Sequence, residues 1–240
     1  MKRWEDLPRS MRTSEVRPYY DALKKRRVSR FFKRASDIFG ALLLLILFSP
    51  LFLILAVAIK LDSRGPVFYR QTRVTRYGET FRIHKFRSMT VGADSSGQVT
   101  VKDDPRVTRV GRFIRRCRLD EISQLIDVLE GKMTFVGTRP EVPEYVAAYT
   151  PEMMATLLMP AGVTGLASIR FKDEAELLGS GEDTDRIYRE EVLPAKMKYN
   201  LEELSRVGIP HDLKILFMTV LAALGKDYGE KKKESEETND

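Results

Sequence analysis

The stretch "FGALLLLILFSPLFLILAVAIKLD", residues Phe39 to Asp62, decides how this chain is organised. Within it, the 19 residues from Ala41 to Ile59 carry no charge, which is long enough for a helix to cross a bilayer. The pair Ser49-Pro50 lies at its centre. Pro50 has no N–H to donate to the carbonyl of Ile46, and its ring crowds that carbonyl, so a helix must kink or break here.

Basic residues flank the apolar run on both sides. The preceding "KKRRVSRFFKR" (Lys24 to Arg34) holds seven basic residues and no acid, and further Lys and Arg residues follow the run. Because cytoplasmic flanks attract Lys and Arg, a simple span would show a bias toward one end. The symmetric charge favours a re-entrant helix–break–helix that enters one leaflet and turns back, with the Ser49 hydroxyl bonding a freed carbonyl. A kinked transmembrane helix is the alternative.

The composition narrows the class of protein. The 240 residues carry a net charge of +7, which suits an anionic partner such as lipid, nucleic acid or a phosphorylated substrate. The basic run precedes an apolar run, which favours lipid headgroups over nucleic acid, with Phe31 and Phe32 at the interface. The single Cys117 excludes an internal disulfide framework and a multi-cysteine zinc site. The run begins too far into the chain, and is too long, for a secretory signal.

The rest of the chain predicts a mainly helical α+β fold with one small catalytic domain. We expect a basic juxtamembrane segment (1–36), a re-entrant hairpin (37–60), a catalytic domain (61–225) and a polar, disordered tail (226–240). Residues 65–89 predict a β-hairpin with its turn at "RYGE", followed by a Gly-, Ser- and Asp-rich loop. Helices are expected at about 112–129, 142–150, 152–158, 190–206 and 211–224, the last in the core or at the interface, with a short strand within 159–171.

The stretch "GRFIRRCRLDEISQLIDVLEGKMTFVGTRPEVP" carries the candidate chemistry. On a continuous helix, Asp120, Gln124 and Asp127 would share one face. Arginines surround the pair Asp120-Glu121, and carboxylates among arginines suit phosphate chemistry, because guanidinium groups bind phosphate oxygens and a carboxylate can hold Mg²⁺ or attack phosphorus. The alternative is a solvated helix face with salt bridges, in a membrane-tethered scaffold protein without catalysis.

Four stretches together closely resemble the bacterial sugar transferases, the monotopic polyprenol-phosphate phosphoglycosyl transferases. They are "KFRSM", "DDPRVTRVGRFIRR", "LDEISQLIDVLEGKMTFVGTRP" and "PAGVTGL". The resemblance covers residues from about 33 to 224. It implies transfer of a phospho-sugar from a UDP-sugar to polyprenyl (undecaprenyl) phosphate with release of UMP, as the first membrane step of bacterial glycan assembly. It also implies a re-entrant helix broken at a Ser-Pro pair, matched here by Ser49-Pro50, on the cytoplasmic face of the inner membrane.

By the same resemblance, Asp120 is the nucleophile that forms a covalent phospho-sugar intermediate, and Glu121 is its partner. Mg²⁺ is the expected cofactor, with both carboxylates as candidate ligands. Arg115 and Arg139 match phosphate-binding positions. The remaining candidate phosphate or substrate contacts are Lys85, Arg87 and Arg112. The expected partners are the UDP-sugar, polyprenyl phosphate and inner-membrane lipid, with no nucleic acid; a homodimer is left open.

The sequence departs from the family pattern at several positions. Ser123 stands where proline is usual after the acid pair, and Thr138 replaces the first proline of Pro-Arg-Pro. Thr75 and Arg76 occupy a turn where glycine is usual. The continuation "ASIRFKDEAELL" is also unusual, so the residues that recognise the sugar are not assigned, and the sugar itself is not identified.

Overall fold

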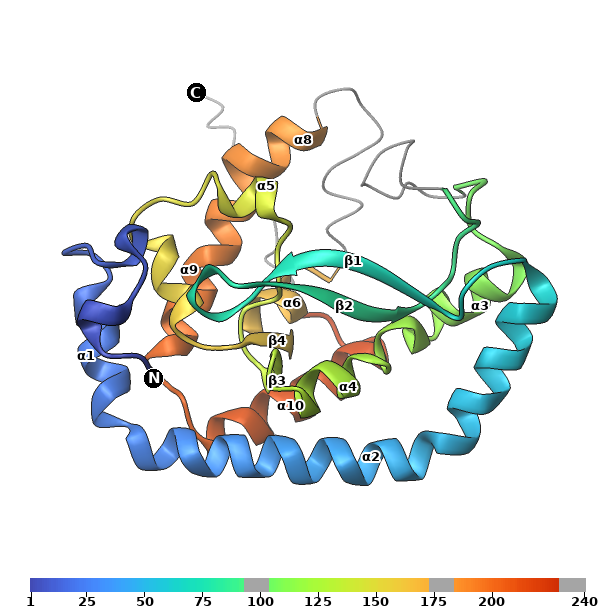
Figure 1. Ribbon diagram of the computed structural model, residues 1–240, viewed down its shortest axis with the longest axis horizontal. Coiled ribbons are helices and arrows are strands. Elements are labelled where there is room, and N and C mark those ends of the chain that lie inside the picture. Colours follow the sequence, from blue (N-terminus) through green and yellow to red (C-terminus); the bar gives the residue numbers. More distant parts are fainter. Residues whose placement is uncertain (93–103, 173–183, 229–240) are drawn as a thin grey trace, which may run out of the picture.

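The computed structural model describes residues 1–92, 104–172 and 184–228, and the fold is mainly helical with two small sheets (Figure 1). The α-helices are α1 (Arg17–Lys25), α2 (Arg27–Asp62), α3 (Arg109–Arg116), α4 (Gln124–Leu129), α5 (Pro143–Val146), α6 (Leu166–Arg170), α8 (Thr184–Ile187), α9 (Leu193–Leu204) and α10 (Ile209–Ala223). The strands are β1 (Phe68–Val74), β2 (Thr80–Phe86), β3 (Met133–Val136) and β4 (Ala161–Thr164). This confirms the predicted α+β class.

Helix α2 runs along one side of the molecule and curves toward its C-terminal end (Figure 1). The helix continues through Pro50, so the expected break is a bend within one element. Proline bends a helix because it removes one backbone hydrogen bond and crowds the preceding turn. The Ser49 hydroxyl donates to the carbonyl of Ile46 at 2.8 Å, which is the oxygen that Pro50 leaves without a backbone donor. The predicted role of this hydroxyl is therefore confirmed.

The outer face of α2 is apolar and exposed. The helix is long and apolar enough to cross a membrane, and only 11% of its most apolar window is buried. Large side chains exposed along this face are Phe39, Leu42, Leu43, Ile46, Leu47, Leu53, Ile54 and Val57. A soluble surface rarely exposes so continuous an apolar patch, so this face indicates contact with lipid. Helix α10 adds a second exposed stripe at Leu213, Phe217, Val220 and Leu224.

The inner face of α2 is polar where it meets the rest of the fold. Lys33 is buried, donates to the carbonyl of Val136 at 2.9 Å and pairs with Asp212 of α10. One turn later Asp37 accepts hydrogen bonds from the Thr134 hydroxyl (2.6 Å) and a β3 backbone N–H. Part of the basic run expected at lipid headgroups, including Lys33, therefore binds inside the protein.

Strands β1 and β2 form the predicted hairpin. They pair antiparallel, with Tyr69 opposite Lys85 and Arg73 opposite Phe81. The turn contains Tyr77 with a φ of 64°, a left-handed backbone conformation that residues other than glycine seldom adopt. The predicted hairpin and its turn are confirmed.

The predicted helix over 112–129 is interrupted. Helix α3 ends at Arg116, Arg118 has a left-handed φ of 55°, and a 3₁₀ turn covers Leu119–Glu121 before α4 begins at Gln124. Asp120 therefore does not share a continuous helix with Asp127. The apolar periodicity did not reveal this break, because the residue in the left-handed conformation is an arginine, where glycine would be the usual signal.

The other predicted elements differ in extent. Helix α5 covers only one turn of the expected 142–150, and the segment expected at 152–158 is a 3₁₀ helix, Met153–Leu158. The expected strand within 159–171 is β4, which precedes helix α6 and pairs parallel with β3. A π-helical turn, Tyr188–Val192, leads into α9. Most of the predicted polar tail and of the Gly-, Ser- and Asp-rich loop lies outside the described residues.

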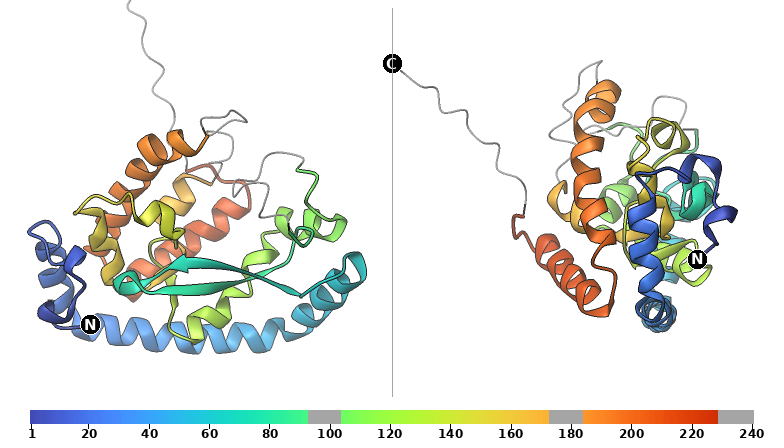
Figure 2. Two further views of the ribbon diagram at one scale, coloured as in Figure 1. Left: turned by 45° about the horizontal axis from the view of Figure 1, so that its top comes forward. Right: turned by 90° about the vertical axis from the view of Figure 1, so that its left-hand side faces the viewer.

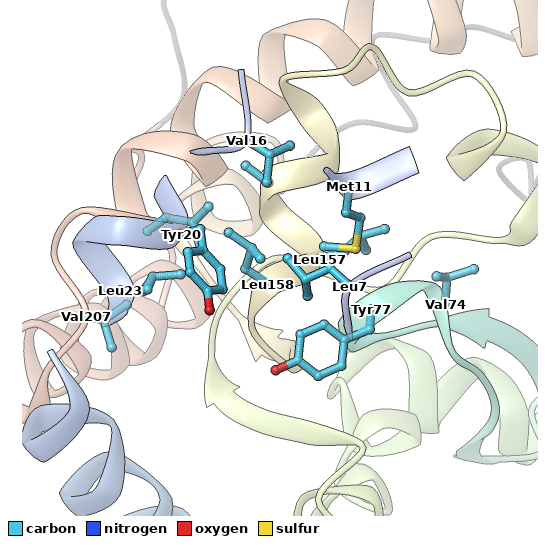
Figure 3. Close-up of a cluster of buried hydrophobic side chains, with 12 residues drawn as sticks. Leu7, Met11, Val16, Tyr20, Leu23, Val74, Tyr77, Leu157, Leu158 and Val207 are labelled. Carbon is cyan, nitrogen blue, oxygen red and sulfur yellow. The ribbon is translucent and has the colours of Figure 1, made fainter. Parts of the chain in front are cut away.

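The first 26 residues pack onto the domain that follows α2. Two 3₁₀ turns, Trp4–Asp6 and Arg9–Met11, and helix α1 contribute buried side chains to one apolar cluster. Figure 3 shows Met11, Tyr20 and Leu23 in one cluster with Leu158 and with Tyr77 of the hairpin turn. The view from the side in Figure 2 shows α1 beside the long α9, with the start of α2 below it. The N-terminal segment is therefore part of the fold.

Candidate active site

The acid pair lies in the 3₁₀ turn between α3 and α4, packed against strand β2. Arg118 follows the end of α3, and its left-handed backbone redirects the chain immediately before the turn that holds the pair. Ser123 then fixes the turn, because its buried hydroxyl donates to the carbonyl of His84 in β2 at 3.1 Å. The serine that replaces the usual proline therefore links the acid pair to the hairpin.

Glu121 is held by two cations from other segments. Lys85 of β2 donates to Oε1 at 3.2 Å, and Arg139, just after β3, donates to Oε2 at 3.3 Å and also to Oε1. Burial would raise the pKa of Glu121, but the charges of Arg139 and Lys85 outweigh burial and hold the pKa well below its usual range. Glu121 is therefore ionised, and it fixes both cations beside Asp120.

Asp120 is the accessible carboxylate of the pair. Within the described ranges, no side chain forms an ion pair or hydrogen bond with it, and it is only partly buried. Burial raises the pKa of Asp120, the charge of Lys85 lowers it, and Glu121 raises it further. A carboxylate with free oxygens beside fixed cations has the properties of a nucleophile toward phosphorus.

The remaining predicted phosphate contacts divide into two groups. Lys85 and Arg139 meet at Glu121, and the charge of Arg115 acts on Asp120. Arg87 points elsewhere: it is buried and donates to the carbonyls of residues 59, 63 and 64 at the end of α2. Arg112 donates to the carbonyl of residue 107. The structure therefore brings together three of the five predicted basic contacts.

Asp127 and Gln124 lie in the core, away from the acid pair. Asp127 is fully buried and accepts from the backbone N–H of His84 (2.9 Å), and its other oxygen lies 2.8 Å from the His84 ring nitrogen Nδ1. Gln124 is also buried. The pairing of His84 with Asp127 indicates a structural role for this histidine.

The donor set at the acid pair fits a Mg²⁺ ion through Asp120. No group of three His, Cys, Asp or Glu side chains that would hold a metal occurs in the described part of the chain. Mg²⁺ needs only one or two carboxylates when waters and substrate phosphates complete its shell. Asp120 has unengaged oxygens for this purpose, whereas both oxygens of Glu121 already accept from cations.

Sequence reasoning missed Gln71 and Arg73 on β1. The side chain of Arg73 donates to the carbonyl of Pro140, next to Arg139, and its charge acts on Lys85, so it neighbours the two cations that hold Glu121. The signal was present in the hairpin register, because alternate residues of paired strands share a face.

An exposed apolar helix and an acid pair with cations around it are the features expected of a membrane-associated protein that handles an anionic substrate. The sequence matches the bacterial sugar transferase family over residues 28–226, and the chain belongs to this family. It is 38% identical over 198 residues, 80% of this chain, to the UDP-glucose:undecaprenyl-phosphate glucose-1-phosphate transferase of Escherichia coli (strain K12). The match covers 40% of that relative, so this chain spans less than half of its length.

Coverage differs among the other relatives. The exopolysaccharide production protein PSS of Rhizobium leguminosarum bv. phaseoli is 38% identical over 209 residues, covering 82% of this chain and 97% of that protein. The undecaprenyl-phosphate galactose phosphotransferase of Salmonella typhimurium is 33% identical, with coverage of 84% of this chain and 42% of that protein. The names of these relatives include both glucose and galactose, so the family alone does not identify the sugar for this chain.

Proposed function

We propose that this chain transfers a sugar 1-phosphate from a UDP-sugar to undecaprenyl phosphate and releases UMP. The observation that carries the proposal is Asp120, whose carboxylate has no side-chain partner among the described residues, beside Glu121, whose carboxylate is held by two cations. The family and the names of the relatives supply the class of substrate. The exposed apolar face of α2 supplies a means of reaching a lipid substrate.

In the first step, an oxygen of Asp120 attacks the β-phosphorus of the UDP-sugar. The bond between this phosphorus and the bridging oxygen breaks, and UMP leaves with the electron pair. Lys85 and Arg139, oriented by Glu121, stabilise charge on the phosphoryl oxygens, and Arg115 adds a positive field. The product is a sugar phosphate bound covalently to Asp120.

In the second step, a phosphate oxygen of the lipid attacks the same phosphorus. The bond to Asp120 breaks, the carboxylate is regenerated, and the sugar is left on a lipid diphosphate. The two-step route has a physical reason: two unit charges 4 Å apart repel by about 4 kcal/mol at an effective dielectric constant of 20. Passing through Asp120 means that the two anionic substrates need not occupy the site together.

Mg²⁺, held by Asp120 and the substrate phosphates, would supply charge neutralisation at the phosphoryl oxygens when bound. Glu121 acts differently in this proposal. Because its oxygens accept from Lys85 and Arg139, its contribution is to place those two cations.

The proposal places the protein on the cytoplasmic face of the bacterial inner membrane, with α2 re-entrant. The exposed apolar face of α2, the bend at Pro50 and the basic residues at both ends of the run support this arrangement. Such a helix would hold the acid pair at the depth of lipid headgroups, where polyprenyl phosphate presents its charge. Replacing Ser49 and Pro50 by Ala and Leu should convert α2 to a helix that spans the membrane and should impair transfer. A membrane-spanning variant with unchanged activity would refute the placement.

The test of the chemistry is Asp120→Asn in membranes, with a panel of UDP-sugars, undecaprenyl phosphate and Mg²⁺. We expect UMP release from the wild type with at least one sugar, and none from the variant, with membrane association unchanged. Mass spectrometry of rapidly quenched wild type should find a phospho-sugar on the peptide that contains Asp120. A phospho-sugar on another residue, or transfer by Asp120→Asn, would overturn the assignment.

A further inference from the structure

Strand β1 carries a fourth cation, Arg73, beside the cations that hold Glu121. Directly opposed residues of an antiparallel pair project from the same face, and alternate residues along a strand share that face. Tyr69 is opposite Lys85, so Tyr69, Gln71 and Arg73 are on the face of the hairpin that presents Lys85. The charge of Arg73 acts on Lys85, and Arg73 is itself affected by the charge of Arg139.

The guanidinium of Arg73 is held in one orientation by neutral groups. Its Nε and Nη2 atoms donate to Oε1 of Gln71 at 3.1 and 2.7 Å. Its Nη1 atom donates to the carbonyl of Pro140 at 3.0 Å. Arginine has five N–H donors, so three are occupied and one remains on each terminal nitrogen. Free donors on both terminal nitrogens allow a guanidinium to contact two phosphate oxygens.

Arg73 has no counter-ion among the described residues. The carboxylate that acts on it most strongly is Glu141, which is itself buried and already bound by Lys196 at 3.3 Å and by the Tyr188 hydroxyl at 2.7 Å. Burial lowers the pKa of Arg73, but a guanidinium remains protonated at neutral pH. Burying a charge without a partner is costly, so a folded site that keeps one gains from an incoming anion.

The charges around the pair leave an excess of positive charge. Asp120 and Glu121 supply two negative charges. Lys85, Arg115 and Arg139 act on one or both of these carboxylates, and Arg73 acts on Lys85, so four positive charges lie in this region. We propose that Arg73, oriented by Gln71, is a further phosphate-binding residue of this site. The inference rests on the proposed function, because it assigns Arg73 to one of that reaction's two anionic substrates, the UDP-sugar or the lipid phosphate.

The matched control is Arg70. It lies on the same strand but on the opposite face, and it donates to the carbonyl of Arg82 at 2.7 Å. The experiment compares Arg73→Gln, Arg73→Lys, Gln71→Met and Arg70→Gln in nanodiscs, with thermal unfolding as a check on folding. Arg73→Lys keeps the charge but loses the paired donors, so it separates a lost contact from a failure to fold.

We expect Arg73→Gln to raise the KM for one of the two anionic substrates at least tenfold. Gln71→Met and Arg73→Lys should raise the same KM by a smaller factor. Arg70→Gln should leave the KM values for both substrates unchanged. A burst of UMP in the absence of lipid identifies the source. If the UDP-sugar is the ligand, the burst of Arg73→Gln slows and recovers at high UDP-sugar. If the lipid phosphate is the ligand, the burst is unchanged and only the KM for lipid rises.

The inference is overturned if folded Arg73→Gln leaves both KM values within twofold of wild type, including the case in which only kcat falls. An effect of equal size in Arg70→Gln would overturn it too. Equilibrium binding of UDP and of inorganic pyrophosphate to wild type and Arg73→Gln requires no turnover. If wild type releases no UMP with any sugar, the proposed function fails, while weaker binding of either anion to Arg73→Gln would still support the anion site. Equal binding by both proteins would then refute the site as well.

Discussion

Glu121→Gln tests whether the site depends on a carboxylate that never reacts. The substitution keeps the shape of the side chain but removes its charge, and it places an amide N–H₂ group against one of the cations. Glu121 accepts hydrogen bonds from Lys85 and Arg139, and hydrogen bonds to charged groups contribute about 1.5–3 kcal/mol each. If about 1.5 kcal/mol is lost at each cation, the barrier rises by about 3 kcal/mol, which is a fall of about 100-fold in rate.

The pH profile of Glu121→Gln gives a second, independent readout. Burial raises the pKa of Asp120 and the charge of Glu121 raises it further, so removing that charge lowers this pKa. Asp120 must be ionised to attack, and the acidic limb of kcat/KM therefore moves to lower pH. Burial lowers the pKa of Lys85 and Glu121 opposes this effect, so the substitution lowers the pKa of Lys85 as well. The alkaline limb then moves in the same direction.

The assay is UMP release in nanodiscs across a range of pH, with Glu79→Gln as the control. Glu79 lies at the hairpin turn and pairs with the exposed Lys2 at 3.4 Å. Exposed pairs contribute about 0–1 kcal/mol, so its loss should change the rate by less than about twofold. The reasoning is refuted if folded Glu121→Gln keeps its rate within a few-fold of wild type, or if the two limbs of its profile move apart.

Three further tests, at Lys33, Ser49 and Arg118, address how the fold positions this site. Lys33→Met leaves Asp212 buried without its partner and should lower the free energy of unfolding by about 3–5 kcal/mol. The double variant Lys33→Met/Asp212→Leu should recover much of this loss. Thermal unfolding in detergent measures both variants, and an unchanged melting temperature in Lys33→Met would contradict the pairing. Ser49→Ala removes the hydroxyl that bonds the Ile46 carbonyl and should lower stability in nanodiscs by about 1 kcal/mol, a result that equal denaturation midpoints would rule out. Arg118→Gly should melt at or above the wild-type temperature, and Arg118→Val below it, because a left-handed backbone costs a non-glycine residue about 1–2 kcal/mol; the reverse order would contradict this account.

Local patterns in the sequence predicted the parts of the fold that depend on local chemistry. The apolar run predicted a long apolar helix broken at Ser49-Pro50; the structure has one helix that continues through Pro50, and it confirms the role of the Ser49 hydroxyl. Alternation and turn residues predicted the hairpin. The break at Arg118 was missed, because nothing in an arginine side chain signals a left-handed backbone. The direction of Arg87 was missed for a different reason: its acceptors are carbonyls at the end of α2, more than twenty residues away.

The site itself depends on contacts that no linear pattern contains. The acid pair comes from the turn before α4, and its cations come from β2 and from the segment after β3. Both ends of this arrangement are attached to the inner face of α2. Arg34 donates to the last carbonyls of α4 at 2.6 and 3.0 Å, and Asp37 binds the backbone of β3. The other face of the same helix is apolar and exposed, so in the proposed membrane placement the depth of α2 fixes the depth of the acid pair.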